Sequence, residues 1–144
     1  MTGILKSNHL LTPHPGEFKR LAPDLADSPR ESAAREFADR TGATLLLKGC
    51  RTIVTRAGSP LWMNATGTPG MATGGQGDLL SGVIGALLAR KHPLPNAASL
   101  GAWVCGRAAE RALHASHLSE ESLTPSDVLE NVGGAFRDWA RQTR

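Results

Sequence analysis

The chain has 144 residues, 40% of them hydrophobic and 20% charged, so it is long enough to bury the core of about one domain. Its net charge of +3 comes without runs of like charge, and 4% of its residues are aromatic with no Tyr, which excludes a basic nucleic-acid arm and an aromatic platform for single strands. The two cysteines, too few for a disulfide framework, and the lack of a membrane-length apolar run or secretion signal favour a cytoplasmic protein without a membrane partner.

The first third of the chain predicts a short strand and two helices. Residues 8–12 have the pattern of the end of a short apolar strand, and the two prolines that follow exclude a strand interior there. A proline at the first position predicts a helix over residues 15–21. Ser28–Glu31 has the pattern of a capping box for a second helix that runs to about Arg40 and is ended by Gly42.

The middle of the chain predicts a buried strand and a β-hairpin. The continuous apolar run Thr44–Leu47 is typical of a buried, parallel strand. Residues 52–55 and 61–63 flank the turn sequence Ala57–Pro60 and predict a hairpin. A loop rich in Gly and Thr then runs from Thr66 to Gly77.

Three helices are predicted after this loop. Apolar residues at helical spacing predict a helix over residues 79–88. Its other faces carry the small residues Gly82, Gly85, Ala86 and Ala89, so we expect the helix to be buried. An alanine-rich helix covers about 96–114, and Thr124–Asp127 caps a last helix to about Trp139. Strands mixed with helices of this length predict a layered α/β fold.

The strongest chemical signal is Gly74–Asp78, directly before a helix. Glycines let the backbone approach a ligand closely, and the free N–H groups of a helix N-terminus attract an anion such as phosphate. The segment is neither a Walker A loop nor a Rossmann fingerprint. The alternative is that the glycines only turn the chain and that Asp78 only caps the helix.

Two weaker signals lie earlier in the chain. Lys48 ends an apolar strand and begins the turn Lys48–Thr52, and a cation at the carboxyl end of a parallel strand points to the crevice where α/β sheets bind ligands. In Thr12–Glu17, prolines on both sides restrict His14. The alternatives are an exposed hairpin and a surface histidine. The other histidines lack the spacing of metal ligands, so no metal site is expected.

In this order the three segments resemble the ADP/ATP-dependent NAD(P)H-hydrate dehydratase family, which has the ribokinase-like fold. The matching residues are Leu11–Glu17, Lys48–Thr52 and Asn64–Gly82. The Gly-x-Gly-Asp core alone resembles the wider superfamily of small-molecule kinases, and Thr12–Glu17 narrows the resemblance to the dehydratases.

The resemblance implies repair of a damaged cofactor, in which the S-form of hydrated NADH or NADPH loses water at the expense of a nucleotide. By position, His14 and Asp78 contact the hydrated cofactor, and Asp78 is the catalytic base. Adenine nucleotide is expected at Lys48, Gly49, Cys50, Arg51, Thr52, Gly75 and Gly77. The expected co-substrate is ADP or ATP with Mg²⁺. Met71–Thr73 resembles the ADP-using branch, which we favour, whereas Gln76 and Leu79–Leu80 resemble the ATP-using one.

The resemblance covers the C-terminal half of the family domain, so residues 1–144 are expected to form one partial ribokinase-like domain. We expect its partly parallel sheet, β-hairpin and flanking helices to lack the cover that the family's other half provides. A homo-oligomer, or a partner that supplies this half, is therefore expected, and the chain alone should be a poor enzyme. The alternatives are another ribokinase-like small-molecule kinase and a catalytically incomplete half-domain.

Overall fold

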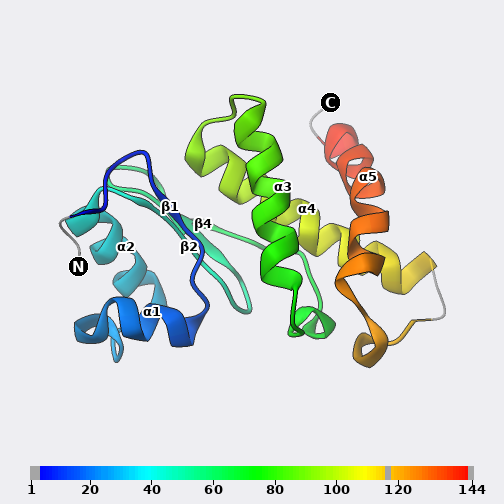
Figure 1. Ribbon diagram of the computed structural model, residues 1–144, viewed down its shortest axis with the longest axis horizontal. Coiled ribbons are helices and arrows are strands. Elements are labelled where there is room, and N and C mark those ends of the chain that lie inside the picture. Colours follow the sequence, from blue (N-terminus) through cyan, green and yellow to red (C-terminus); the bar gives the residue numbers. More distant parts are fainter. Residues whose placement is uncertain (1–3, 116–117, 143–144) are drawn as a thin grey trace. The chain divides into compact units, whose positions relative to one another are not determined.

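The computed structural model describes residues 4–115 and 118–142, and shows a four-stranded sheet with α-helices (Figure 1). The chain divides into two compact units. The first, the sheet unit, comprises Met1–Asn64 and His92–Ser99. The second, the helical unit, comprises Ala65–Lys91 and Leu100–Arg144. The predicted α/β class is confirmed.

The sheet has the strand order β1-β2-β3-β4. Its strands are β1 (Leu10–Leu11), β2 (Thr44–Leu47), β3 (Ile53–Thr55) and β4 (Trp62–Met63). β1 pairs with β2 in parallel, whereas β2 with β3 and β3 with β4 are antiparallel pairs. The parallel strand and the hairpin predicted from the sequence are therefore both present. All four residues of β2 are buried, as its continuous apolar run predicts.

Two helices complete the sheet unit, α1 (Pro15–Leu21) and α2 (Arg30–Thr41). As predicted, α2 ends at Gly42, whose φ of 69° is left-handed. The predicted capping box at its start is wrong: the N-cap residue is Pro29, which makes no side-chain cap hydrogen bond. The helix begins one residue later than a Ser28 cap requires, so the Ser28 hydroxyl lies outside the cap position.

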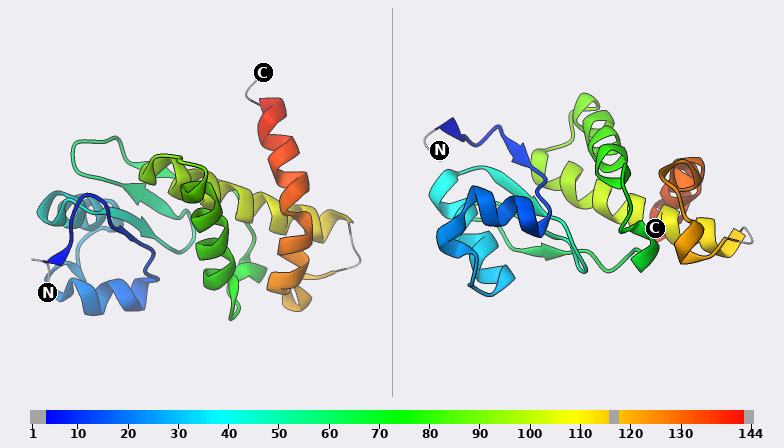
Figure 2. Two further views of the ribbon diagram at one scale, coloured as in Figure 1. Left: turned by 45° about the horizontal axis from the view of Figure 1, so that its top comes forward. Right: turned by 60° about the horizontal axis from the view of Figure 1, so that its bottom comes forward.

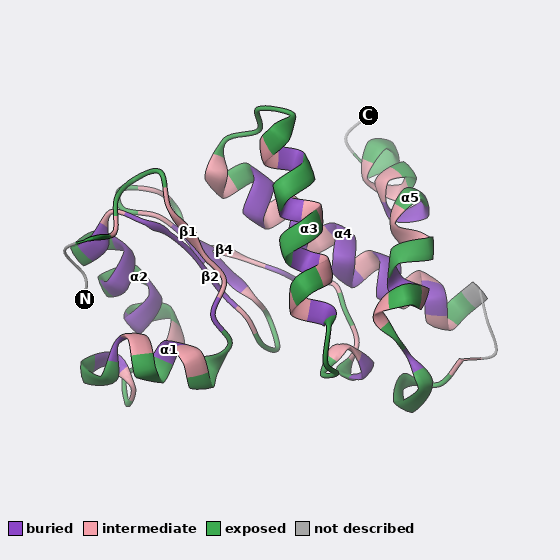
Figure 3. Ribbon diagram, viewed as in Figure 1, coloured by how far each residue is buried: buried purple, intermediate pink, exposed green. Residues whose placement is uncertain are grey.

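The core of the sheet unit lies where α1 and α2 pack against the sheet. Phe18 of α1 and Phe37 of α2 meet edge to face with ring centroids 5.5 Å apart. Leu45, Leu47 and Ile53 of the strands join the same cluster. Figure 3 shows the buried residues of α2 and the strands in purple.

The helical unit is built from α3 (Gln76–Ala89), the part of α4 (Leu94–Ala115) from Leu100 on, and α5 (Pro125–Gln142). Within it, α3 and α5 run across α4 (Figure 2). Trp103 of α4 meets Trp139 of α5 edge to face at 5.1 Å. The predicted cap of α5 is confirmed, because the Thr124 N–H donates to the carboxylate of Asp127 at 2.8 Å.

The expectation that α3 is buried on nearly all sides is wrong for one of its faces. Leu80, Ile84 and Leu87 are buried, but the small residues between them are exposed (Figure 3): Gly82, Gly85, Ala86 and Ala89. Such residues carry little apolar surface, so burying them contributes little free energy. The large side chains alone therefore decide which face of α3 turns inward. Within the described residues, no helix is long and apolar enough to cross a membrane.

Candidate functional site

Two of the three segments singled out in the sequence meet where the neighbouring strands β1 and β2 end. β1 and β2 are parallel, so the segments that leave their carboxyl ends start from the same edge. The Lys48 N–H, directly after β2, donates to the Pro13 carbonyl oxygen, after β1, at 2.9 Å. This hydrogen bond ties the His14 segment to the start of the Lys48–Thr52 loop.

His14 is the N-cap residue of α1. Its Nδ1 accepts hydrogen bonds from the N–H groups of Gly16 at 3.1 Å and Glu17 at 3.2 Å. An imidazole nitrogen that accepts in this way carries no proton, so Nε2 carries the proton in the neutral ring. Nε2 lies 3.4 Å from a Glu17 carboxylate oxygen, and the side chain is half exposed. The cap, in addition to the flanking prolines, therefore fixes the ring.

Glu17 connects His14 with Lys48. One carboxylate oxygen accepts the His14 N–H at 2.7 Å and lies 3.7 Å from the Lys48 ammonium. The hydrogen bond from the His14 backbone, with the charge of Lys48, holds the pKa of Glu17 below its ordinary value. Glu17 had no role of its own in the prediction from sequence. An acid three residues after a helix N-cap is the signature of a capping box, and that signal could have identified it.

The Lys48–Thr52 loop has an unusual backbone. Gly49 has a φ of 135° and Arg51 a φ of 54°, conformations that side chains disfavour. The Thr52 hydroxyl donates to the Gly49 carbonyl at 3.1 Å. Cys50 is a free, exposed thiol. The loop is therefore a shaped turn with accessible residues at its tip.

The third segment forms the start of α3 in the helical unit. The N-cap residue Gly75 has a φ of 87° and no side chain to cap the helix. The N–H groups of Asp78 and Leu79 both donate to the Gly75 carbonyl at 3.1 Å. The N–H groups of Gln76 and Gly77 precede these bonds, and first-turn donors have no acceptor within a helix. They are the groups that an anion would use.

Two side chains at this helix start differ in burial. Asp78 is exposed in the first turn, where its charge suits the helix dipole, and the structure records no cap bond from it within the described residues. Gln76 is 8% exposed, and neither polar atom of its amide has a hydrogen-bond partner. An unpaired buried amide is costly to folding, so its position calls for a reason beyond stability. From sequence, Gln76 served only to compare branches of the family.

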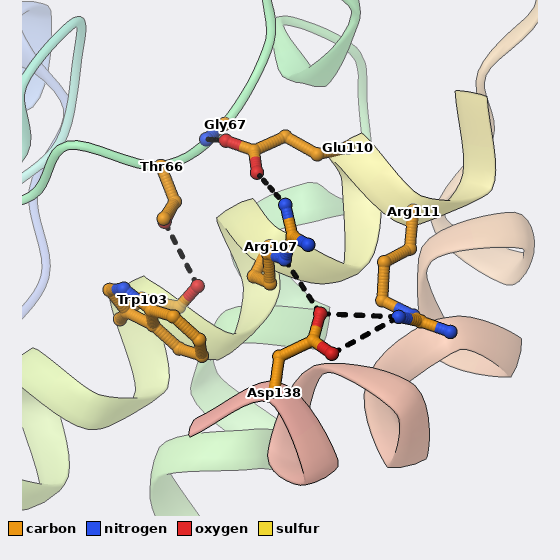
Figure 4. A network of polar contacts seen from close by, with 7 residues as sticks. All are labelled: Thr66, Gly67, Trp103, Arg107, Glu110, Arg111 and Asp138. Atoms are coloured by element: carbon orange, nitrogen blue, oxygen red, sulfur yellow. Dashed lines mark hydrogen bonds and ion pairs between the residues drawn. The ribbon is translucent and has the colours of Figure 1, made fainter. Parts of the chain in front are cut away.

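The loop that leads to α3 is held by α4. The Thr66 hydroxyl donates to the Trp103 carbonyl at 2.9 Å, and the Gly67 N–H donates to the Glu110 carboxylate at 2.8 Å (Figure 4). Arg107 in turn donates to the other Glu110 oxygen at 3.0 Å. The first residues of the loop are therefore fixed to one side of α4.

The same network joins α4 to α5. Asp138 accepts from Arg107 at 2.7 Å and from Arg111 at 3.1 Å (Figure 4). The hydrogen bond from Arg107, with that from Arg111, keeps the pKa of Asp138 below its ordinary value. A Cβ on Gly134 would lie 2.3 Å from the Arg111 Nε. Gly134 therefore lets the guanidinium lie against α5.

Close backbone contacts hold the rest of the loop. A Cβ on Gly70 would lie 2.5 Å from the Glu120 carbonyl oxygen, and one on Gly106 would lie 2.3 Å from the Thr66 hydroxyl oxygen. Both distances are shorter than real Cβ contacts. These glycines are therefore needed for packing, whatever ligand the loop binds.

The described residues contain no group of three or more His, Cys, Asp or Glu side chains that could hold a metal ion. Mg²⁺ needs no such group when a nucleotide is present, because it keeps several waters and binds through one or two carboxylates and substrate phosphates. The exposed carboxylate of Asp78 fits that pattern.

Comparison with known proteins identifies the family. The family model described as NAD(P)H-hydrate dehydratase matches residues 4–132. A bifunctional NAD(P)H-hydrate repair enzyme of Gloeobacter violaceus is 49% identical over 106 residues, which is 68% of this chain and 21% of that protein. An ADP-dependent (S)-NAD(P)H-hydrate dehydratase of Neisseria meningitidis is 42% identical over 106 residues, which is 72% of this chain and 36% of that protein.

Solved structures show the same relationship. The ADP/ATP-dependent NAD(P)H-hydrate dehydratase of Bacillus subtilis, co-crystallized with ATP and Mg²⁺, matches with a TM-score of 0.72 at 31% identity over 90% of this chain. The match covers 47% of the Bacillus chain, so this chain spans less than half the length of these relatives. The resemblance found in the three motifs is confirmed, and the chain belongs to the NAD(P)H-hydrate dehydratase family.

Proposed function

We propose that this chain takes part in the nucleotide-dependent dehydration of the S-form of hydrated NADH or NADPH, which restores the working cofactor. The observation that carries the proposal is the junction of His14, Glu17 and Lys48 at the ends of two parallel strands. It brings the segment specific to the dehydratases next to the loop proposed for the nucleotide. Family membership supports the same reaction.

The proposed chemistry converts a poor leaving group into a good one. The nucleotide phosphorylates the ring hydroxyl and the ring nitrogen then expels the phosphate as an iminium forms. Loss of a proton from the neighbouring ring carbon restores the double bond. Asp78 is proposed to take the hydroxyl proton, which requires an ionised carboxylate within hydrogen-bond reach of the substrate. Its exposure at the start of α3 leaves it accessible. Overall, the reaction is that of a carbon–oxygen lyase.

From the resemblance to the family we propose two candidate nucleotide-contacting segments, one in the sheet unit and one in the helical unit. In the first, Lys48 neutralises phosphate charge and the shaped turn from Gly49 to Thr52 contacts the nucleotide. In the second, the N–H groups around Gly75 and Gly77 bind phosphate, as helix N-termini do. Positioning and charge neutralisation are most of what phosphoryl transfer asks of a protein.

ADP is the proposed co-substrate, with ATP as the alternative. The Neisseria relative is named ADP-dependent and the Bacillus relative ADP/ATP-dependent. Mg²⁺ would be held mainly by the nucleotide phosphates, where it neutralises their charge. His14 is proposed to contact the hydrated cofactor through its half-exposed imidazole, whose Nε2 lies beside the Glu17 carboxylate.

A second candidate is a catalytically incomplete half-domain. The observation that favours it is coverage, since the chain matches 47% of the Bacillus structure and 21% of the Gloeobacter enzyme. In that case residues 1–144 form a partial ribokinase-like domain that works as a homo-oligomer or with a partner chain. A cytoplasmic location is proposed because the substrate is a soluble metabolic cofactor.

The test combines binding and turnover. Amide NMR spectra are recorded while ADP is added, and shifts are expected at Gly49, Cys50 and Gly77. Turnover is followed by the return of reduced-nicotinamide absorbance from hydrated NADH, against a panel of vitamin precursors as kinase substrates. Shifts confined to other residues would overturn the nucleotide assignment. Phosphorylation of a vitamin precursor without dehydration would favour the kinase alternative, and binding without turnover would favour the half-domain.

A further inference from the structure

Arg30, the first residue of α2, contacts two residues of the Lys48–Thr52 loop that lie 18 and 20 residues later in the chain. Its Nη1 donates to the Cys50 carbonyl at 2.8 Å and its Nη2 to the Lys48 carbonyl at 3.3 Å. Its Nε is buried and has no hydrogen-bond partner. The two loop carbonyls therefore account for the hydrogen bonds of the guanidinium that the structure records.

Gly49 lies between Lys48 and Cys50 in the chain, and its lack of a side chain leaves room for the Arg30 guanidinium. Its φ of 135° disfavours a side chain, and a Cβ there would lie 3.1 Å from the Arg30 Nη2. The guanidinium thus occupies the space that a side chain at position 49 would fill. The absence of a side chain at position 49 therefore makes room for the guanidinium against the loop.

The contact also affects the charge that a ligand would meet. Two peptide carbonyls bound to a guanidinium have their negative ends neutralised, because the donor is a cation. Lys48 adds its own ammonium, which is partly buried beside Glu17. An anionic phosphate near this loop would therefore meet less repulsion from carbonyl oxygens.

We propose that Arg30 is a positioning residue that holds the Lys48–Thr52 loop in its nucleotide-binding conformation. The inference rests on the proposed function for its ligand, an adenine nucleotide, and on the described contacts for its mechanism. Arg30 acts through the backbone of the loop. Lysine is no substitute, because its single ammonium lacks the fork that reaches two carbonyls at once.

The loop carries its own reporter. Cys50 is exposed, whereas Cys105 is 3% exposed and burial raises its pKa to about 12. Thiolates react with iodoacetamide and buried thiols stay inert, so the alkylation rate of the folded chain measures Cys50. The variants are Arg30→Met and Arg30→Lys, with Arg35→Met, an exposed arginine on the same helix, as the matched control.

We expect both Arg30 variants to alkylate Cys50 several-fold faster than the wild type, well below their melting temperatures. The Kd for ADP, measured by calorimetry, should rise about tenfold to a hundredfold. This factor corresponds to the free energy lost when hydrogen bonds from a charged donor are removed. ADP should slow Cys50 alkylation in the wild type and in the Arg35 control. Arg30→Lys keeps the charge and the stem, so it serves if Arg30→Met fails to fold.

The outcomes separate the inference from the function it rests on. Wild-type Cys50 rates and ADP affinity in the Arg30 variants would overturn the positioning role and leave the nucleotide site standing. A change in melting temperature alone, with rates and affinity unchanged, would also overturn it. No ADP affinity in the wild type would overturn the nucleotide site. Faster Cys50 alkylation in the Arg30 variants would still show that Arg30 holds the loop in the wild type.

Discussion

His14 and Glu17 each serve the helix and the site with different atoms. Nδ1 of His14 caps α1 while Nε2 lies beside the Glu17 carboxylate, and Glu17 closes the capping box while it faces Lys48. A capping box stabilises a helix end by about 1 kcal/mol, so stability alone accounts for these residue types. Their place at the ends of β1 and β2 is what links them to binding.

Glu17→Gln tests the charge of this carboxylate. Folding lowers the pKa of Glu17 from its ordinary value of 4.5, through the His14 hydrogen bond and the charge of Lys48. Such a group stabilises the folded state above the ordinary value and loses that effect as the pH falls through the folded value. The variant should therefore lower the free energy of unfolding at neutral pH, and by less as the pH falls below 4.5.

The measurement is urea unfolding at neutral pH and at about pH 3.5. Glu130→Gln, on the exposed side of α5, is the control and should change neither value. The amide oxygen of the variant can still accept the His14 N–H, so the difference reports the charge. An equal loss at both pH values would mean that the charge of Glu17 contributes nothing.

Asp78→Asn separates catalysis from binding. The amide keeps the shape of the carboxylate but cannot accept a proton, so turnover of hydrated NADH should fall about a hundredfold to ten-thousandfold. ADP affinity should change little, because the proposed phosphate contacts are backbone N–H groups. The assay uses whichever assembly of this chain turns over hydrated NADH. Asp39→Asn, an exposed aspartate on α2, is the control, and unchanged turnover in Asp78→Asn would remove Asp78 as the base.

At the scale of elements, the loop before α3 is fixed by contacts that glycine alone permits. Gly70→Ala would place a methyl group 2.5 Å from the backbone oxygen of Glu120, and backbone cannot move aside cheaply. We expect a loss of about 1–3 kcal/mol in the free energy of unfolding. Gly85→Ala is the matched change: nothing lies within 4 Å of its added Cβ. In the middle of a helix it should stabilise by about 0.5–1 kcal/mol.

Thermal and urea unfolding of the two variants give the answer. A neutral Gly70→Ala would mean that the loop shifts to relieve the contact. A destabilising Gly85→Ala would mean that something covers this face of α3 in solution, where the added methyl group meets it. The pair therefore tests the packing of the loop and the exposure of the helix with one type of substitution.

The elements that the sequence predicted well are those with local signals. The prolines before α1, the Gly42 at the end of α2 and the turn between β3 and β4 each act on neighbouring residues, and these boundaries were confirmed. The predicted start of α2 was wrong because a cap forms only when the helix begins directly after the capping residue, and α2 begins one residue too late for Ser28. The prediction that α3 is buried was wrong for one face because Gly and Ala count as apolar residues in a sequence whether or not another element covers them.

The site was predicted as far as its motifs were continuous in sequence. The segments around His14 and Lys48 were identified, and their meeting follows from parallel strands. The contact of Arg30 with a loop 18 and 20 residues away has no sequence pattern, nor does the network from Asp138 to Gly67. Long-range polar contacts of this kind depend on tertiary packing. The roles of Asp78 and of the nucleotide residues stay predictions.

At the scale of the molecule, the sheet has a free edge. β1 has two residues and pairs with β2 alone among the described strands. An unpaired edge exposes backbone N–H and C=O groups to another chain. The face of α3 with small residues is also exposed, and Leu129 on α5 is 58% exposed. Relatives have further chain beyond the matched part, since 47% of the Bacillus structure is covered.

We therefore predict that the 144-residue chain associates in solution and is a poor enzyme by itself. Association should bury the β1 edge, so hydrogen exchange at Leu10 and Leu11 should slow as protein concentration rises, in step with the mass from light scattering. Leu129→Ser removes the exposed apolar residue on α5 without touching the sheet. If association is unchanged in that variant, the sheet edge or α3 carries it, and if association is lost, α5 does. A concentration-independent monomer that dehydrates hydrated NADH at a rate typical of enzymes, about 1 per second or faster, would show that none of the three exposed features needs cover.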